Sequence, residues 1–384
     1  MPASPNDGSA GVVTLKVTSE GTPVPDVLQV ISVRVGRLAN AVPWARLEFR
    51  DGDMPHQTFP GSDGEELAPG KAIVIEAGYG GQTAQIFSGV VIKHALRVVG
   101  DNDSRLIVEC RDKAVAMTVG RKNANFVDQT DSDVISAVAG TYGLTVDAES
   151  TTLQHAGLVQ HNCTDWDFVL ARAEANGMLV IADDGTLKIK APAATGQAAL
   201  KVTYGQDLIE FDAEVDARSQ FASVQAVGWS PAQQAITEGT SASPGTLGAL
   251  GNLDGATLAA VLNLALYRLQ VPLPLEQAML TQWAKAVQGK ATLARLRGKV
   301  RFQGSSALKV GDLLELAGVG QRFSGTAFVT GLDHEIGDGD WVTQARFGLA
   351  PNWSTEQADV VAPYAGGLAP GVHGLQVGKV MKLD

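Results

Sequence analysis

Cysteine, charged residues and long apolar runs are all scarce in this 384-residue sequence. Its two cysteines, Cys110 and Cys163, lack CxxC or zinc-finger spacing, which argues against a cysteine-based metal site and favours two buried or inert thiols. No apolar run approaches the roughly 20 residues of a membrane helix, so no stable membrane insertion is expected. Residues 1–8 hold neither a basic nor an apolar segment, and we expect synthesis in the cytoplasm without a signal peptide.

The charge balance is acidic. The 41 Asp and Glu residues exceed the 30 Lys and Arg residues, and the resulting formal charge of -11 repels phosphate backbones, so no nucleic-acid binding is expected. Charged residues make up only 18% of the chain, whereas glycine occurs 43 times, a composition typical of many short strands joined by tight turns. The length exceeds that of one hydrophobic core, which predicts a multidomain α+β protein that is mainly β.

Strand and helix patterns alternate along the chain and predict its division into domains. The insert holds two helical patterns, 258–269 and 275–296, separated by two prolines. The apolar stripe of 275–296 fits the chain's own core and packing on a neighbouring chain equally well. The predicted domains are a first tube-like β-barrel (1–120), an α/β module (121–198), a second tube-like β-barrel (199–232 and 299–350), a helical insert (233–298), and a linker that enters the first strand of a further domain (351–384).

An internal repeat is the most informative feature. Residues 67–80 resemble residues 308–320 turn by strand by turn, and each copy is followed by Phe-Ser-Gly and then by a strand that reaches a histidine. Two barrels of one design are therefore expected, and three such chains would present six alike barrels around a three-fold axis. The repeat-related positions, which we expect to be structural and candidates for docking to a tube, are Gly70, Gly78, Phe87, Gly89, His94, Gly311, Gly318, Phe323, Gly325 and His334.

Several ordered motifs share their residue pattern with one known family. The segments are 164–170, 173–178, 183–187, 216–226, 300–304 and 331–349. They resemble the VgrG-type spike family, which is related to contractile-phage tail hub and late-control proteins. The similarity covers the hub portion of that family, and within its motifs Trp166, Phe168 and Gly177 are expected to be structural. Residues 43–53 and 59–69 look closer to extracellular injection systems and tailocins than to type VI secretion spikes.

The resemblance implies a structural hub of a contractile injection machine, without catalytic residues, cofactors or metal. The expected partners are a second and third copy of the chain, a hexameric Hcp-like inner tube protein and baseplate subunits, with a PAAR-type spike-tip protein and effectors as further candidates. The assembled particle is expected to be released from the cell or to be extracellular. The family's oligonucleotide/oligosaccharide-fold domain and β-helix needle would follow a junction at Gly378 and Val380; the given sequence holds neither, so they are expected either in a continuation of this chain or in a separate chain.

Two other classes of protein remain alternatives. A muralytic enzyme would need acids such as Asp183-Asp184 or the pair Asp338 and Asp340, although their places beside glycine favour solvated hairpin turns. The neighbours His161, Cys163 and Asp165 could form a nucleophilic centre, but a strand end followed by a helix cap explains them better. A stand-alone carbohydrate-binding β-module is the second alternative.

Overall fold

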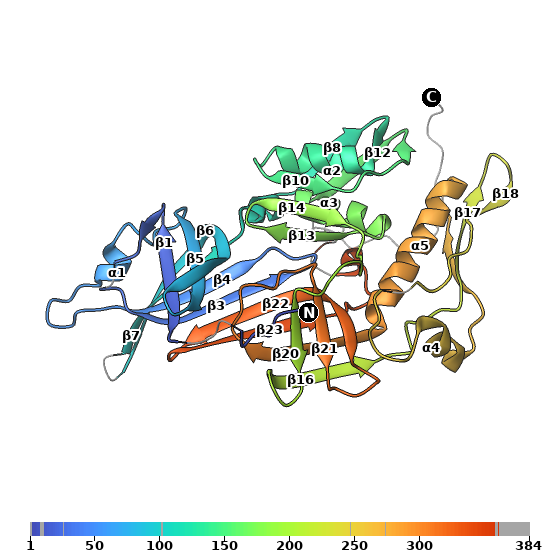
Figure 1. Cartoon of the computed structure of the whole chain (residues 1–384). Coiled ribbons are helices and arrows are strands. Elements are labelled where there is room, and N and C mark those ends of the chain that lie inside the picture. The colour runs from blue at the N-terminus through green and yellow to red at the C-terminus, as the bar shows by residue number, and fades with distance from the viewer. Residues whose placement is uncertain are drawn as a thin grey trace, which may run out of the picture.

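The protein is mainly β in a computed structural model of the whole chain (Figure 1). The structure describes residues 2–7, 11–25, 27–100, 103–245, 247–272, 274–357 and 360. Most of the expected linker, including Gly378 and Val380, lies outside the described residues. No helix in the described part is long and apolar enough to cross a membrane.

A 13-stranded sheet forms the body of the described chain, and it has two halves that we call the first and second arm. The first arm comprises β1 (Val13–Ser19), β2 (Thr22–Pro23), β3 (Val30–Leu38), β4 (Trp44–Arg50), β5 (Ala72–Tyr79), β6 (Gln82–Val99) and β7 (Asp103–Arg111), with the short helix α1 (Pro60–Asp63). The second arm comprises β15 (Leu200–Thr203), β16 (Leu208–Val215), β20 (Leu296–Gln303), β21 (Leu313–Ala317), β22 (Gly325–Gly337) and β23 (Asp340–Phe347).

The described strands form no closed barrel, in contrast to the two barrels expected from the sequence. The order of the main path is β16-β20-β23-β22-β3-β4-β7-β6-β5-β1-β2, and β21 and β15 branch from β22. Each arm curls around its own apolar core, in which Phe49 of the first arm and Phe302 of the second are fully buried. The arms are joined edge to edge by β3 and β22, so that the sheet runs on from one core to the other.

A compact α/β module packs over the sheet (Figure 1). Its elements are η1 (Lys113–Thr118), β8 (Lys122–Phe126), β9 (Gln129–Thr130), α2 (Asp131–Gly140), β10 (Thr145–Ala148), β11 (Gln154–His155), β12 (Leu158–Cys163), α3 (Asp165–Ala175), β13 (Leu179–Asp183) and β14 (Thr186–Lys190). Both helices begin with threonine caps: Thr130 closes a capping box with Asp133, and the Thr164 hydroxyl accepts the Asp167 amide at 3.1 Å. These side chains satisfy amides that would otherwise lack partners in the first helical turn.

The insert between β16 and β20 is partly helical. It contains β17 (Val224–Ser230), β18 (Ala235–Glu238), α4 (Gly255–Leu262), β19 (Tyr267–Val271) and α5 (Gln277–Ala294), and η2 (Ser354–Glu356) lies beside it. The prediction of a helix over 258–269 was wrong in its second half. Asn263 takes a left-handed conformation that ends α4, and β19 pairs with β17 in parallel. The helical periodicity of the sequence was misleading here because backbone pairing with a distant strand determines the conformation of 267–271.

The apolar stripe of α5 faces the chain's own core. Leu280 and Ala284 are buried against β17 together with Val224, and Val287 joins the same cluster. The sequence alone left packing within one chain and packing on a neighbour equally open. The fold assigns this stripe to the interior of the insert and, through Leu293 and Leu296, to the core of the second arm.

Candidate assembly surface

The two segments of the internal repeat fold as the same turn and strand. Gly70 and Gly311 both have a φ of 97°, a value that L-residues with a Cβ avoid. The Gly70 amide donates to the Val91 carbonyl at 2.8 Å, and the Gly311 amide donates to the Val329 carbonyl at 2.9 Å. In both copies the glycine amide therefore ties the turn before the hairpin to the hairpin's second strand, β6 or β22.

The likeness extends over six strands of each arm. The first arm has the order β3-β4-β7-β6-β5-β1 and the second has β16-β20-β23-β22-β21-β15, so each strand has a counterpart at the same place in the chain order. A β-bulge interrupts β3 between Val30 and Ser32 and β16 between Leu208 and Glu210. Another lies after Val91 in β6 and after Val329 in β22. Shared bulges fix one alignment of the two arms, because a bulge shifts every later pair by one residue.

In this structural alignment, some residues that the sequence repeat had matched are no longer equivalent. Gly325 lies opposite Leu316, where the first arm has Phe87 opposite Ile75, so the two Phe-Ser-Gly segments are two residues out of step. The histidines are offset in the same way. His94 corresponds to Leu332, and His334 corresponds to Leu96, because both alignments start from the matched bulges.

The repeat-related glycines have different neighbours in the two arms. A Cβ on Gly78 would lie 1.8 Å from the Gln82 carbonyl oxygen, whereas Gly318 follows β21 with a φ of 76°. A Cβ on Gly89 would meet the Arg111 carbonyl, and one on Gly325 would meet the Ala249 carbonyl. Their aromatic neighbours also differ, since Phe87 is fully buried in the first core and Phe323 is partly buried beside the second. These residues shape each arm locally and do not form one site.

The junction between the arms is a continuous antiparallel ladder. Its register pairs Leu332 with Arg37, His334 with Val35, Glu335 with Arg34 and Ile336 with Val33. One face of this ladder is buried: Ile336 is 7% exposed and Val33 is 0% exposed, and both contribute to the first core. The other face carries charged side chains, so the junction has the alternation of a sheet that is covered on one side.

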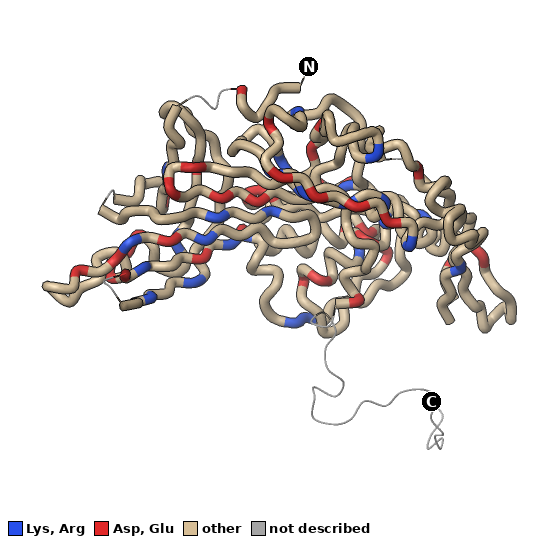
Figure 2. The backbone as a smooth tube through the Cα atoms, turned by 90° about the horizontal axis from the view of Figure 1, so that it is seen from below, with Lys and Arg blue, Asp and Glu red and all other residues tan. Residues whose placement is uncertain are grey.

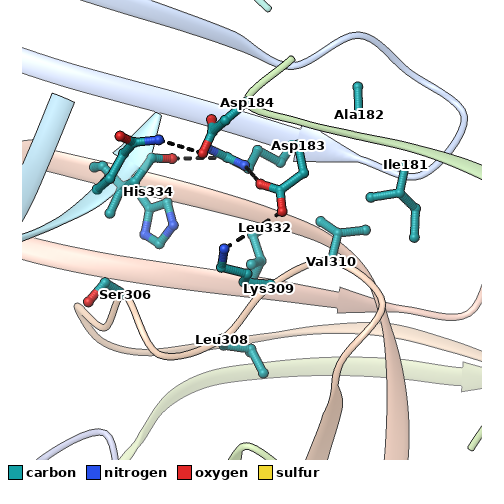
Figure 3. Close-up of a pocket in the computed structure, with 13 residues that line it drawn as sticks. Ile181, Ala182, Asp183, Asp184, Ser306, Leu308, Lys309, Val310, Leu332 and His334 are labelled. Atoms are coloured by element: carbon teal, nitrogen blue, oxygen red, sulfur yellow. Dashed lines mark hydrogen bonds and ion pairs between the residues drawn. The ribbon is translucent and has the colours of Figure 1, made fainter. Parts of the chain in front are cut away.

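A partly buried ion-pair network attaches the α/β module to this junction (Figure 3). The Arg37 guanidinium reaches Asp183 and Asp184 at 2.6 Å each, and its Nε donates to the Ile86 carbonyl at 2.9 Å. Gln85 and the Ser88 amide also donate to Asp184. The sequence had favoured solvated turn acids here, and that interpretation was wrong, because the tip of the β13–β14 hairpin packs against Arg37 of the first arm and lies beside Lys309 of the second.

The electrostatics of this network favour the ionised carboxylate. Burial raises the pKa of Asp183, but the hydrogen bond from Lys188 and the charge of Arg37 outweigh burial and leave the pKa below its ordinary value. Asp338 and Asp340 differ from this pair, because both are exposed in the β22–β23 turn. The acids at 183 and 184 thus hold two parts of the chain together.

Both histidines have partners within the described chain. His94 is half-buried, with Nε2 2.9 Å from the Ser62 hydroxyl and Nδ1 3.0 Å from the Leu67 carbonyl. His334 is buried, and its Nδ1 lies 3.0 Å from the Thr343 hydroxyl. Burial, helped by the charge of Arg37, lowers the pKa of His334 to about 3. No cluster of three metal-binding side chains occurs among the described residues.

The motif residues of the α/β module lie in its core and at a helix end. Trp166 and Phe168 are buried on α3, and Gly177 has a φ of 69° just beyond that helix. The Asp165 carboxylate binds Lys122, Tyr142 and Gln160 beneath α3. Burial, followed by the charge of Asp167, raises the pKa of Cys163, which disfavours the thiolate that a nucleophile would need.

No described strand pairs with the second half of β6 or with the outer edge of β16, the strand that ends the main path. β6 pairs with β5 only as far as Val90, and its second half, Ile92 to Val99, pairs with β7 alone. β16 pairs only with β20. Sequence analysis missed both edges, although the alternating acids Glu210, Asp212, Glu214 and Asp216 would have indicated a strand with one strongly charged face.

Solved structures of tail proteins share this fold. A 43 kDa tail protein of prophage MuSo2 from Shewanella oneidensis is 12% identical and has a TM-score of 0.64, with 88% of this chain and 98% of that chain covered. A tail protein from Neisseria meningitidis is 13% identical with a TM-score of 0.63, covering 89% and 98%. The expected resemblance to the VgrG-type hub fold is confirmed at the level of the fold.

A third structure links the fold to secretion systems. An E. coli component of the type VI secretion system, described as structurally similar to tail proteins of bacteriophage T4, is 12% identical with a TM-score of 0.57, covering 88% of this chain and 79% of that chain. No curated protein sequence matches the chain. A family model described as the Alg8 N-terminal domain matches residues 9–338.

Proposed function

The chain belongs to the family of the Alg8 N-terminal domain. From its fold and its duplicated arms we propose that it is a structural hub of a contractile, phage-tail-like injection machine. In this role it is a trimeric adaptor between a hexameric inner tube and a three-fold spike. Its partners are two further copies of itself, the tube protein and baseplate subunits, with a spike-tip protein and effectors on the distal side. The assembled particle would act outside the cell that makes it.

The duplication of the arms is the observation that supports this proposal. Each arm contributes an antiparallel wall of four strands, β3-β4-β7-β6 or β16-β20-β23-β22, and the walls are already joined edge to edge within one chain. Three copies around an axis would present six alike walls to a six-fold partner. The insert and the α/β module each occur once in the chain and are not duplicated. The surface that they form in a trimer would therefore keep three-fold symmetry.

The secondary features of the fold agree with a part that transmits force. Both arms have fully buried apolar cores, and the junction between them is held by a continuous ladder and by the Arg37 network. A load along the sheet would be carried by many backbone hydrogen bonds at once and not by a hinge. This role needs broad, well-packed interfaces rather than a catalytic cleft.

The test combines the mass of the assembly with binding to a tube. Light scattering on the purified full chain should give three times the monomer mass of 40.1 kDa. The trimer should co-sediment with rings or tubes of a hexameric inner-tube protein. A chain that stays monomeric at micromolar concentration, or clears cell-wall zymograms, would overturn the adaptor role, and in the latter case an enzyme would replace it.

A further inference from the structure

The unpaired half of β6 and the free edge of β16 have the same relation to their arms as the two strands that join the arms within the chain. The matched bulges make β6 the counterpart of β22 and β16 the counterpart of β3. In the chain, β22 continues past its bulge and pairs with β3. β6 also continues past its bulge, but among the described residues no strand covers that edge.

We propose that β16 of one copy pairs with residues 93–99 of β6 in the next copy, in the register that β3 and β22 use within the chain. This inference rests on the proposed trimer and names the seam that would build it. Transferring the internal register residue by residue predicts these pairs across the seam: Lys93 with Asp216, His94 with Val215, Ala95 with Glu214, Leu96 with Ala213, Arg97 with Asp212, Val98 with Phe211 and Val99 with Glu210.

The apolar face of the proposed seam matches the buried face of the internal junction. Leu96 and Val98 are 41% and 63% exposed in the single chain, whereas their counterparts His334 and Ile336 are 3% and 7% exposed. Opposite them, the seam places Ala213 and Phe211 of the partner strand. A second copy docked in this register would cover apolar side chains that the single chain leaves in solvent.

The opposite face is complementary in charge. β16 carries an acid at every second position from Glu210 to Asp216, visible as a row of acidic positions in Figure 2, which views the molecule from the side on which β16 lies. The β6 edge carries Lys93 and Arg97 on the corresponding face. The register places both basic residues opposite acids and brings no two like charges together. Glu335 and Arg34 are the counterparts within the chain, with the signs exchanged.

The geometry also limits the alternatives. A shift of the register by one residue would bring the acids of β16 to the side of Leu96 and Val98, because side chains alternate across a strand. A shift by two would keep the faces but would place Asp212 opposite Ala95 or Val99, so the pair between Arg97 and Asp212 would be lost. The edges belong to different ends of the same chain, so the contact is heterologous and closes into a ring only if the rotation between copies allows it.

Disulfide capture tests the register directly. In a Cys163→Ser background, Leu96→Cys combined with Ala213→Cys, and Ala95→Cys combined with Glu214→Cys, should cross-link copies under mild oxidation. One of these two neighbouring pairs is of the non-hydrogen-bonded type, whose Cα atoms lie about 4.5 Å apart. The matched control, Leu96→Cys with Phe211→Cys, is displaced by roughly 7 Å along the strand and should not react.

The expected product is a covalent trimer on a non-reducing gel for an in-register double variant, and only a dimer when two single-cysteine chains are mixed. A trimer by light scattering that cross-links only through the displaced control would overturn the register and leave the proposed function standing. Absence of any trimer would overturn both. The free thiol of Cys110 does not interfere, because it is buried and its pKa is raised to about 12.

A charge exchange provides an independent measurement. No ion pair of Arg97 or Asp212 occurs among the described residues, although the charge of Arg97 helps to lower the pKa of Asp103, so we expect the folded monomer to tolerate both substitutions. Arg97→Asp and Asp212→Arg should each lower the association constant of the trimer about tenfold or more, because each opposes like charges at every seam. Arg97→Asp combined with Asp212→Arg should restore it. Failure of the double variant to recover, with both single variants impaired, would overturn the pairing.

Discussion

The first and second arms show which features of a repeated unit are kept and which are free to change. The wall strands keep their order and both bulges, but the outermost strand does not: β1 runs antiparallel to β5, whereas β15 runs parallel to β21. The connections differ too. β3 and β4 are joined by residues 39–43, and the same place in the second arm holds the whole insert. Register is retained in the wall strands, and variation collects at strand ends and outer edges.

The matched cores of the arms offer the strongest comparison. Phe49 and Phe302 occupy equivalent positions, and both are fully buried. Phe49→Ala and Phe302→Ala should each lower the free energy of unfolding by about 3–5 kcal/mol, since each leaves a cavity. Urea unfolding followed by fluorescence would measure the loss, with exposed Val127→Ala as a control that changes stability by less than about 0.5 kcal/mol. A large difference between the two phenylalanines would break the equivalence of the cores.

The second comparison concerns the Arg37 network, which has no counterpart in the second arm. The residue equivalent to Arg37 is Val215. Arg37→Ala should lower the free energy of unfolding by about 3 kcal/mol, because it leaves the largely buried Asp183 and Asp184 carboxylates without the guanidinium that they share. Arg218→Ala is the matched control, since Arg218 pairs with Asp216 at the surface and should contribute far less to stability. Equal effects of the two arginines would contradict the role assigned to the network.

His334 distinguishes the arms by pH, because its counterpart Leu96 does not titrate. In the unfolded chain the imidazole takes up a proton below about pH 6.5, whereas in the folded chain it does so only near its lowered pKa of about 3. The unfolded state therefore binds more protons in that window, and stability is lost as the pH falls from about 6.5 towards 3. His334→Gln should remove about 2 kcal/mol of the change in unfolding free energy between pH 7 and pH 5. Parallel pH profiles for the variant and the native chain would refute this.

The smallest effects are expected at the repeat glycines. Gly70→Ala and Gly311→Ala place a Cβ on backbone of the same φ, at a cost of about 1–2 kcal/mol each. Gly311 should cost more, because its Cβ would lie 3.2 Å from Ile181, whereas nothing lies within 4 Å of a Cβ at Gly70. Urea unfolding of the two variants, measured side by side, would give the loss of unfolding free energy at each glycine. A greater loss for Gly70→Ala than for Gly311→Ala would contradict this expectation.

Local sequence patterns determined much of the fold. The threonine before α3, the turn glycines at 70 and 311 and the alternation of apolar residues in the arms were readable because each acts through neighbours in the chain. The repeat was also readable, although the Phe-Ser-Gly segments and the two histidines suggested a register that the bulges do not support. A bulge leaves little trace in the sequence, since it depends on the partner strand.

The tertiary structure alone decided how distant parts meet. The sequence by itself specified two alike arms, but not their joining through β3 and β22, the insertion of Asp183 and Asp184 beside Arg37, or the strand at 267–271 in place of a helix. In each case the free energy comes from a partner far along the chain, through a ladder or a desolvated ion pair. Such contacts override local preference because their pairing exists only once the chain has folded.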